Sequence, residues 1–175
     1  MWLNPKSTLL AMCLAMTGMT AMSDAKAALA SRSLAANASG TCQSALPVYD
    51  VNIRKRPRAI QNEGDSAAFV TCSYYSQGLD IQSTSNPSSL RVYASVVDGV
   101  EDSLTCTLVM GNGDGPSTYI VKTISLAATG ELAVIWWDST DFPNPPPSGL
   151  FSISCNLTPG VGIRYSVIRF KEEDL

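Results

Sequence analysis

The sequence predicts an all-β fold, a disulfide-stapled antiparallel β-sandwich of immunoglobulin-like or jelly-roll type. The first reason is that short β-branched and aromatic runs recur between Gly, Pro, Asn and Asp turn signals. The second is that two of these runs alternate strictly between apolar and polar residues, which is the period of a half-buried strand. The third is that an even set of four cysteines follows the N-terminal leader, as two disulfides require.

The N-terminus has the three parts of a secretory signal, and residues 1–27 are predicted to be a cleaved signal peptide. Lys6 provides the positive charge, residues 9–22 form the apolar stretch, and residues 25–27 (AKA) are a small-x-small cleavage site. The apolar stretch is shorter than the roughly 20 residues of a membrane span. We therefore expect no membrane span in the mature chain, and a secreted or periplasmic location.

Residues 31–41 (SRSLAANASGT) are small and polar without a sustained hydrophobic period, and residues 28–41 are expected to be a flexible linker. Residues 42–175 are then long enough for one β-sandwich domain with one core. With 12 basic and 15 acidic residues, the chain carries a net charge of −3. This acidic balance argues against nucleic acid as a partner.

The first predicted elements precede residue 98. A short apolar piece, residues 48–53, leads into a basic bend at residues 54–58. Residues 67–74 (AAFVTCSY) read as a clearer strand, and a polar loop interrupted by Gly, Asn and Pro follows it as far as residue 89. Residues 90–97 (LRVYASVV) are rich in β-branched residues and are the next strand.

Residues 103–110 (SLTCTLVM) are a strand of clean period two. Its apolar face carries Leu104, Cys106, Leu108 and Met110. Cys106 is therefore expected to point into the core. Asp98-Gly99 begins the turn from the preceding strand, and the two strands are the best hairpin candidate in the sequence.

The second half of the domain continues the same pattern. The remaining strands are predicted at residues 118–126, 131–137, 149–157 and 163–170. A Gly-rich turn (GNGDGPS) precedes the first of them, and residues 128–130 (ATG), a Pro-rich loop and the Pro159-Gly160 turn separate them. The third of these strands, GLFSISCNL, alternates as cleanly as residues 103–110 do, which places Cys155 on its apolar face.

Cys106 and Cys155 lie in the apolar phase of strands that share a core, so we expect them to form one disulfide. Cys42 and Cys72 then pair by elimination. Four cysteines allow three connectivities, and the sequence leaves the other two open. Closing loops of about 30 and 50 residues would stabilise the fold by roughly 3–4 kcal/mol each.

The segments FVTCSYY, SLTCTLVMGNGDG and GLFSISCNLTPGVGIRYSVIRF together resemble a family of small exported proteobacterial proteins of unknown function. That family has four similarly spaced cysteines in a β-sandwich pattern, and its last cysteine is followed by a Cys-x-Leu-x-Pro-Gly turn and a final strand. Cys155, Leu157, Pro159 and Gly160 match that turn, and the likeness covers about residues 42–170. The resemblance implies a fold but no activity.

The search for catalytic and metal-binding residues is mostly negative. The chain has no His and no Cys-x-x-Cys, which excludes Ser-His-Asp and Cys-His catalysis and argues against a zinc site or a redox pair. The GNGDG run lacks the further ligands of an EF-hand, so no metal or cofactor is expected. A two-carboxylate hydrolase needs only acidic residues, and turn segments offer Asp98, Glu101, Asp102, Asp138 and Asp141. Acidic residues in turns are far more often solvated turn formers than catalytic groups, so we expect this chain not to be an enzyme.

Two groups of side chains are candidates for ligand binding. Trp136 and Trp137 could stack on a sugar, with further rings at Tyr74, Tyr75, Tyr93 and Tyr119. Neighbours in a strand face opposite ways, so one tryptophan is expected in the core.

The other candidate group is a dense basic cluster in an otherwise acidic chain. It consists of Arg54, Lys55, Arg56 and Arg58. Outside the cytoplasm such a cluster could contact an anionic cell-envelope glycan or another exported protein, and a solvated loop is the simpler interpretation. No aromatic residues interleave with it, as single-stranded nucleic acid would require.

The sequence thus favours an exported, non-enzymatic structural or interaction domain, because every strong signal concerns stability and none concerns a reaction. One alternative is a carbohydrate-binding module that uses Trp136 or Trp137. The two-carboxylate hydrolase is a weaker alternative, since it needs paired acidic residues about 5–10 Å apart across a cleft.

Overall fold

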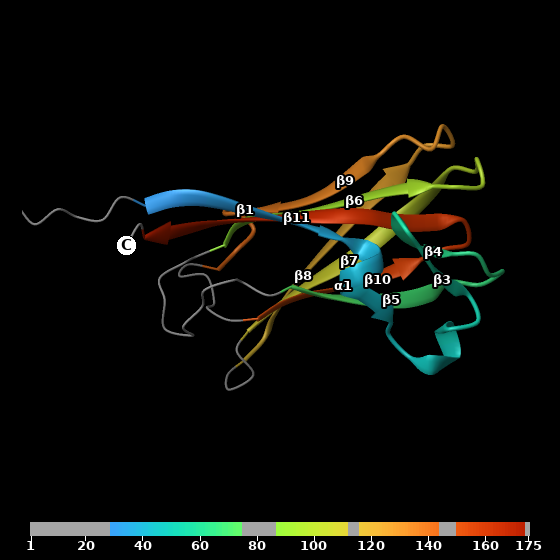
Figure 1. The fold of residues 1–175 in the computed structure, drawn as a ribbon, viewed down its shortest axis with the longest axis horizontal. Helices are drawn as coiled ribbons and strands as arrows, with labels where there is room; N and C mark the ends of the chain where they lie inside the picture. The colour runs from blue at the N-terminus through green and yellow to red at the C-terminus, as the bar shows by residue number, and fades with distance from the viewer. Residues whose placement is uncertain (1–28, 75–86, 112–115, 144–149, 174–175) are drawn as a thin grey trace, which may run out of the picture.

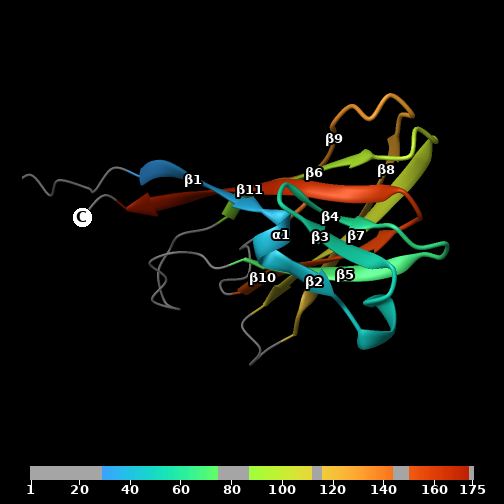
Figure 2. The same cartoon turned by 45° about the vertical axis from the view of Figure 1, so that its right-hand side comes forward.

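Two antiparallel β-sheets, stacked face to face with apolar side chains between them, make up the protein (Figure 1 and Figure 2). The structure is a computed structural model that describes residues 29–74, 87–111, 116–143 and 150–173. The predicted signal peptide and parts of three predicted loops therefore lie outside the described residues. Within the described part of the chain, no helix has the length and hydropathy needed to cross a bilayer.

Sheet A is one of the two layers. Its strands follow the order β3 (Ile53–Arg56), β4 (Ala59–Asn62), β11 (Val161–Glu173), β6 (Pro87–Val96) and β9 (Ala133–Asp138). Strand β1 (Leu29–Asn37) also pairs with β11, along residues 165–173 and beyond the two residues that pair with β4. Figure 1 shows β1 and β11 running side by side to the left of the sandwich.

Sheet B is the second layer. Its strands follow the order β2 (Cys42–Ser44), β5 (Ala68–Tyr74), β10 (Leu150–Leu157), β7 (Asp102–Gly111) and β8 (Thr118–Leu126). A short helix, α1 (Ala38–Thr41), carries the chain from β1 into β2, and a 3-10 helix (Pro47–Tyr49) lies between β2 and β3.

The strand order identifies the jelly-roll type of sandwich. Without the added strands β1, β2 and β3, sheet A runs β4-β11-β6-β9 and sheet B runs β5-β10-β7-β8. Successive strands alternate between the layers except at the β7–β8 hairpin, which is the double Greek key of a jelly roll. The predicted sandwich is confirmed, and the topology decides between the two types that the sequence left open.

The hairpin expected between residues 90–97 and 103–110 is wrong. These residues belong to β6 and β7, which lie in different sheets, because β6 pairs with β11 and β9 while β7 pairs with β10 and β8. The Asp98-Gly99 turn carries the chain across the sandwich instead. Both strands present apolar rows to one core from opposite sides, so the chain has to cross between the layers at this point.

The flexible linker expected at residues 28–41 is also wrong, since residues 29–41 form β1 and α1. Across the β1–β11 ladder Leu34 is opposite Ile168, and Ala36 packs against the core. The Asn37 side chain ends the strand, accepting a 3.0 Å hydrogen bond from the Ser39 N–H as the N-cap of α1. This weakly apolar segment becomes a strand because β11 offers it a backbone edge, a long-range effect that local composition does not reveal.

Residues 54–58 form part of a hairpin rather than a simple basic bend. Strand β3 continues through the basic residues to Arg56, and Pro57-Arg58 is the two-residue turn into β4. Of the apolar piece before it, only Ile53 is buried, while Val48 and Val51 are 67% and 71% exposed. The hairpin therefore sets the cationic side chains along an edge of sheet A.

Both predicted disulfides form, and both lie in sheet B. Cys42 bonds to Cys72 and Cys106 bonds to Cys155, each pair directly opposite in the register of neighbouring strands. All four side chains are buried. The alternation predicted for β7 is confirmed, because every second residue from position 104 to position 110 faces the core. The disulfides therefore fasten strands within one layer rather than joining the two layers.

Candidate ligand-binding face

The adjacent tryptophans of β9 face opposite sides of sheet A. Trp137 points into the core and is fully buried, and its Nε1 donates a 3.1 Å hydrogen bond to the Ile120 carbonyl of β8. Trp137 is therefore a core residue, and its candidacy as a ligand contact is wrong. Trp136 is 47% exposed on the outer face, which leaves its indole available to a ligand.

The seam between β8 and β9 holds the backbone of Trp136 in place. The Lys122 ammonium, from β8, donates a 2.8 Å hydrogen bond to the Trp136 carbonyl and a 2.6 Å charge-assisted bond to Asp141 Oδ2. The same carboxylate oxygen accepts a 2.9 Å bond from the Asp138 N–H. These bonds join the two sheets at their edge, so the indole stands on a fixed strand rather than on a loop.

Arg91 of β6 is opposite Trp136 in the register and covers one face of its indole. Its Cζ lies 4.6 Å from the ring centroid, which is a cation–π contact. The Arg91 Nε is buried and has no hydrogen-bond partner among the described residues. An unsatisfied buried donor costs free energy.

Two tyrosines continue this surface from β6 to β11. Tyr93 and Tyr165 are directly opposite, and their rings stack with centroids 4.3 Å apart and planes 14° apart. On its other side Tyr93 is opposite Val134, which is 37% exposed. We call the surface made by Arg91, Tyr93, Val134, Trp136 and Tyr165 the aromatic face. Since neighbouring strands lie about 4.8 Å apart, it spans about 10 Å across β11, β6 and β9.

A β-bulge in β11 gives the aromatic face its Tyr165. Ile163 is buried opposite Ala94, but Tyr165, two residues further on, is opposite Tyr93, so the register shifts between them. In an unbroken strand, residues two apart would share a face. The bulge reverses the phase, and Arg164 is the residue at that point. The run IRYSVIRF carries no sign of this shift, and neither residue is among the candidates that the sequence identifies.

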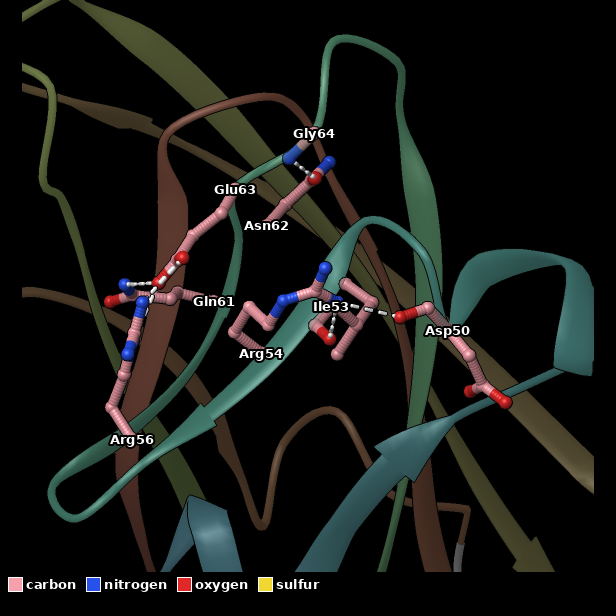
Figure 3. A network of polar contacts seen from close by, with 8 residues as sticks. All are labelled: Asp50, Ile53, Arg54, Arg56, Gln61, Asn62, Glu63 and Gly64. Carbon is pink, nitrogen blue, oxygen red and sulfur yellow. Dashed lines mark hydrogen bonds and ion pairs between the residues drawn. The ribbon is translucent and has the colours of Figure 1, made fainter.

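The structure divides the predicted basic cluster. Figure 3 shows that two of its members, Arg54 and Arg56, form hydrogen bonds with other residues of the chain. Arg56 forms a bidentate ion pair with Glu63, with Nε to Oε1 at 2.7 Å and Nη2 to Oε2 at 2.5 Å. These hydrogen bonds hold the pKa of the Glu63 carboxyl below its ordinary value. Arg54 donates a 2.8 Å hydrogen bond from Nη1 to the Asp50 carbonyl. Both arginines therefore have local structural roles.

The other two cationic residues of the cluster are exposed, and one of them faces a groove. Lys55 lies on β3 outside that groove, whereas Arg58 lines it. The groove has a volume of about 400 Å³ and is lined by Asn37, Arg58, Ser95, Gly130, Leu132, Arg164 and Tyr165. We call it the arginine groove. Because Tyr165 belongs to both surfaces, the arginine groove is continuous with the aromatic face.

The acidic residues considered for hydrolysis lie in two separate places. Asp138 is opposite Ser89 near the start of β6, and Asp98 follows the end of the same strand, so the two lie at opposite ends of β6. Hydrogen bonds from the Thr140 hydroxyl and N–H lower the pKa of the Asp138 carboxyl. The Asp98 carboxylate accepts a 3.1 Å bond from the Val100 N–H. These carboxylates organise turns.

In residues 29–74, 87–111, 116–143 and 150–173, no three His, Cys, Asp or Glu side chains gather in a way that could hold a metal ion.

No protein-family model matches the chain, and no curated protein matches it either. The resemblance to exported proteobacterial proteins therefore stays a prediction.

Comparison with solved structures finds matches of low identity. One is the C-terminal CBM6 of LamC, a marine laminarinase from Zobellia galactanivorans, with 10% identity, a TM-score of 0.46 and coverage of 78% of this chain and 98% of that chain. Another is the carbohydrate-binding module CBM6cm-2 of Cellvibrio mixtus lichenase 5A, in complex with cellotriose, with 16% identity, a TM-score of 0.42 and coverage of 77% and 95%. The family 11 carbohydrate-binding module of Clostridium thermocellum has 11% identity, a TM-score of 0.37 and coverage of 81% and 87%. At these scores the likeness identifies neither a family nor a ligand for this chain.

Proposed function

We propose that this chain is an exported, non-catalytic glycan-binding domain whose ligand lies across the aromatic face. The observation that carries the proposal is the exposed and fixed indole of Trp136. An aromatic ring offers apolar area to the C–H groups of a sugar, while the sugar hydroxyls remain in water or bond to polar groups around the ring. The Arg91 guanidinium and the Tyr93 and Tyr165 side chains supply such groups.

Preorganisation supports this proposal. Trp136 is held through its backbone by Lys122 and through one ring face by Arg91, and the two tyrosines hold each other by stacking. A ligand that meets side chains already in place loses less binding free energy to ordering them.

The covalent framework supports export. Two disulfides in a chain of this size are typical of proteins that fold in an oxidising compartment outside the cytoplasm. The absence of His from the sequence and the use of Asp138 and Asp141 in a turn favour binding over catalysis. A glycan of the cell envelope or its surroundings is then the natural partner class.

Truncation of the exposed indole tests the proposal. Affinity electrophoresis would measure retardation of the purified chain in gels that contain laminarin, xylan, dextran, dextran sulfate or polygalacturonate. The wild type is expected to be retarded by at least one polymer, and Trp136→Ala is expected to weaken that binding at least about tenfold because the stacking surface is lost.

Tyr119→Ala is the matched control. Tyr119 is an aromatic residue that is 67% exposed on β8 of sheet B, so its removal should leave binding unchanged. Near-ultraviolet circular dichroism would show that both variants fold. Equal retardation of Trp136→Ala and the wild type would contradict the proposal. A wild-type chain that no polymer retards would also contradict it, and would favour an interaction domain for another exported protein.

A further inference from the structure

Arg164, at the bulge of β11, is anchored through its Nε. Its Nε donates a 3.0 Å hydrogen bond to Ser95 Oγ on β6, and Ser95 is fully buried. The terminal Nη groups bond to no other side chain or carbonyl among the described residues. A guanidinium held at Nε presents its two Nη groups as a fork, which is the geometry that binds carboxylate or sulfate oxygens in pairs.

Arg58 reaches the same groove from a distant part of the sequence. It lies in the β3–β4 turn, and the carbonyl of its neighbour Pro57 accepts a 3.1 Å hydrogen bond from Asn37 Nδ2. That bond ties the turn to the end of β1. The Arg58 side chain is exposed and makes no ion pair within the described part of the chain.

The charges around the groove are unbalanced in an acidic protein. Two cationic side chains elsewhere pair with carboxylates, Arg56 with Glu63 and Lys122 with Asp141. The described residues that line the groove include two arginines and no Asp or Glu. Two like charges that share one groove repel each other, and an anion bound between them would turn that repulsion into attraction. The missing negative charge is therefore expected to come from a ligand.

Apolar and aromatic groups line the same groove. Such a lining favours an anion carried by a sugar over a free inorganic ion, because the sugar ring can contact the apolar groups. Leu132 is 51% exposed there, and Tyr165 leads from the groove to the stacked Tyr93. We propose that the arginine groove binds an oxyanion carried by the glycan, so that the preferred ligand is an acidic saccharide with a uronate carboxylate or a sulfate ester. This inference rests on the proposed function and names its ligand class.

Two pairs of polymers with matched backbones test the inference and distinguish the two oxyanions. Polygalacturonate is compared with its fully methyl-esterified form, and dextran sulfate with dextran, at physiological ionic strength. The wild type is expected to bind the acidic member of at least one pair at least tenfold more tightly than the neutral member. Equal affinity for both members of both pairs would overturn the inference.

Charge-neutralising variants locate the effect. Arg58→Gln, on an exposed turn, is expected to weaken binding of the acidic polymer at least tenfold and to leave binding of its neutral counterpart unchanged. Lys55→Gln removes the same charge from the neighbouring strand outside the groove, and its affinity should stay within about twofold of the wild type.

Arg164→Gln should weaken binding of the acidic polymer as Arg58→Gln does. Arg164→Lys, which keeps the charge but loses the fork, should recover only part of the affinity. Circular dichroism would verify folding.

The outcomes separate this inference from the proposed function. Equal losses in Lys55→Gln and Arg58→Gln would overturn the inference, because they would indicate attraction by net charge alone. If Trp136→Ala abolishes binding of every polymer while Arg58→Gln changes none, the glycan-binding function stands and the acidic subsite fails. If Arg58→Gln weakens binding while Trp136→Ala leaves it unchanged, the groove binds anions but the aromatic face is not the sugar platform.

Discussion

Two buried side chains, Asn62 and Tyr74, differ in whether their polar groups form hydrogen bonds inside the sandwich. The Asn62 amide is satisfied: its Nδ2 donates 2.8 Å hydrogen bonds to the Ser66 and Leu157 carbonyls, and its Oδ1 accepts a 3.0 Å bond from the Gly64 N–H. The bond to Leu157 joins β4 of sheet A to the end of β10 in sheet B. The Tyr74 hydroxyl, by contrast, is buried without a hydrogen-bond partner among the described residues.

Ionisation of Tyr74 should set the alkaline limit of stability. Burial raises the pKa of this phenol to about 12, and the nearby Ser166 hydroxyl opposes the shift less strongly. The unfolded phenol ionises near pH 10, so its contribution is fully present below about pH 10 and is lost as the pH rises towards about 12. The free energy of unfolding should fall by about 2–3 kcal/mol over that interval.

Urea unfolding of Tyr74→Phe between pH 9 and pH 12 measures this effect. The variant cannot ionise, so it should lack that part of the alkaline loss, and at pH 7 it should be at least as stable as the wild type because an unsatisfied hydroxyl is removed. Tyr119→Phe, at an exposed position, serves as the control and should follow the wild-type curve. Parallel curves for Tyr74→Phe and the wild type would contradict the assignment.

At the scale of elements, the turns decide which layer each strand enters. The turn from β10 to β11 crosses the sandwich at Gly160, whose φ is +77°. Its N–H donates a 2.9 Å bond to the Asn62 carbonyl, and its carbonyl accepts a 2.8 Å bond from the Val97 N–H. A Cβ at this position would also collide with the Asp98 carboxylate. The crossing therefore requires glycine for its backbone angle, and a Cβ would in addition displace the exposed Asp98 carboxylate, which accepts the Val100 N–H bond.

Gly160→Ala should lower the free energy of unfolding by more than the 1–2 kcal/mol or so that a left-handed backbone costs an L-residue. Gly99→Ala provides the first control, since its φ is +76° but a Cβ there meets only one atom, at 3.9 Å, so it should show the backbone cost alone. Gly40→Ala is the second control, because a Cβ there meets nothing within 4 Å and no loss is expected. Thermal unfolding of the three variants measures the series. A loss in Gly160→Ala no larger than in Gly40→Ala would contradict this role.

The stability of the whole domain depends on its two disulfides, although both lie in one sheet. They close loops with sequence separations of 30 and 49 residues, and both sulfur pairs lie against the common core. On the loop-entropy model each bond stabilises the fold by about 3–4 kcal/mol, which is comparable with the whole net stability of a small domain. Reduction should therefore affect both sheets, although the bonds lie in sheet B.

Replacing each disulfide in turn by alanine measures its contribution. Cys42→Ala/Cys72→Ala and Cys106→Ala/Cys155→Ala should each lower the free energy of unfolding by about 3–4 kcal/mol in urea titrations, the second by slightly more because its loop is longer. Strong reductant should lower the Tm of the wild type sharply and should not affect a variant without cysteines. An unchanged wild-type melting curve in reductant, or four free thiols in the oxidised protein by mass mapping, would contradict the structural role.

Strand positions were predicted from the sequence more accurately than the pairing between strands. Clean alternation located β7 and β10, and the tryptophan pair indicated that one ring of β9 would be outside. The pairing of β6 with β7 was wrong because both a hairpin and a crossing of the sandwich begin with a turn such as Asp98-Gly99. For the candidate site, Trp136 and Arg58 were among the predicted residues, whereas Arg164 and Tyr165 depend on a bulge that only the register with β6 reveals.

By itself, the sequence determined that β7 and β10 are strands, which face of each of these two is apolar, and that Cys106 and Cys155 share the core. Those properties follow from side-chain alternation and turn chemistry, which act over a few residues. The tertiary structure alone decided that β1 is a strand, that the layers follow jelly-roll order, and that Arg58 and Arg164 line one groove. These features depend on backbone hydrogen bonds and core packing between distant segments, whose balance no short stretch of sequence contains.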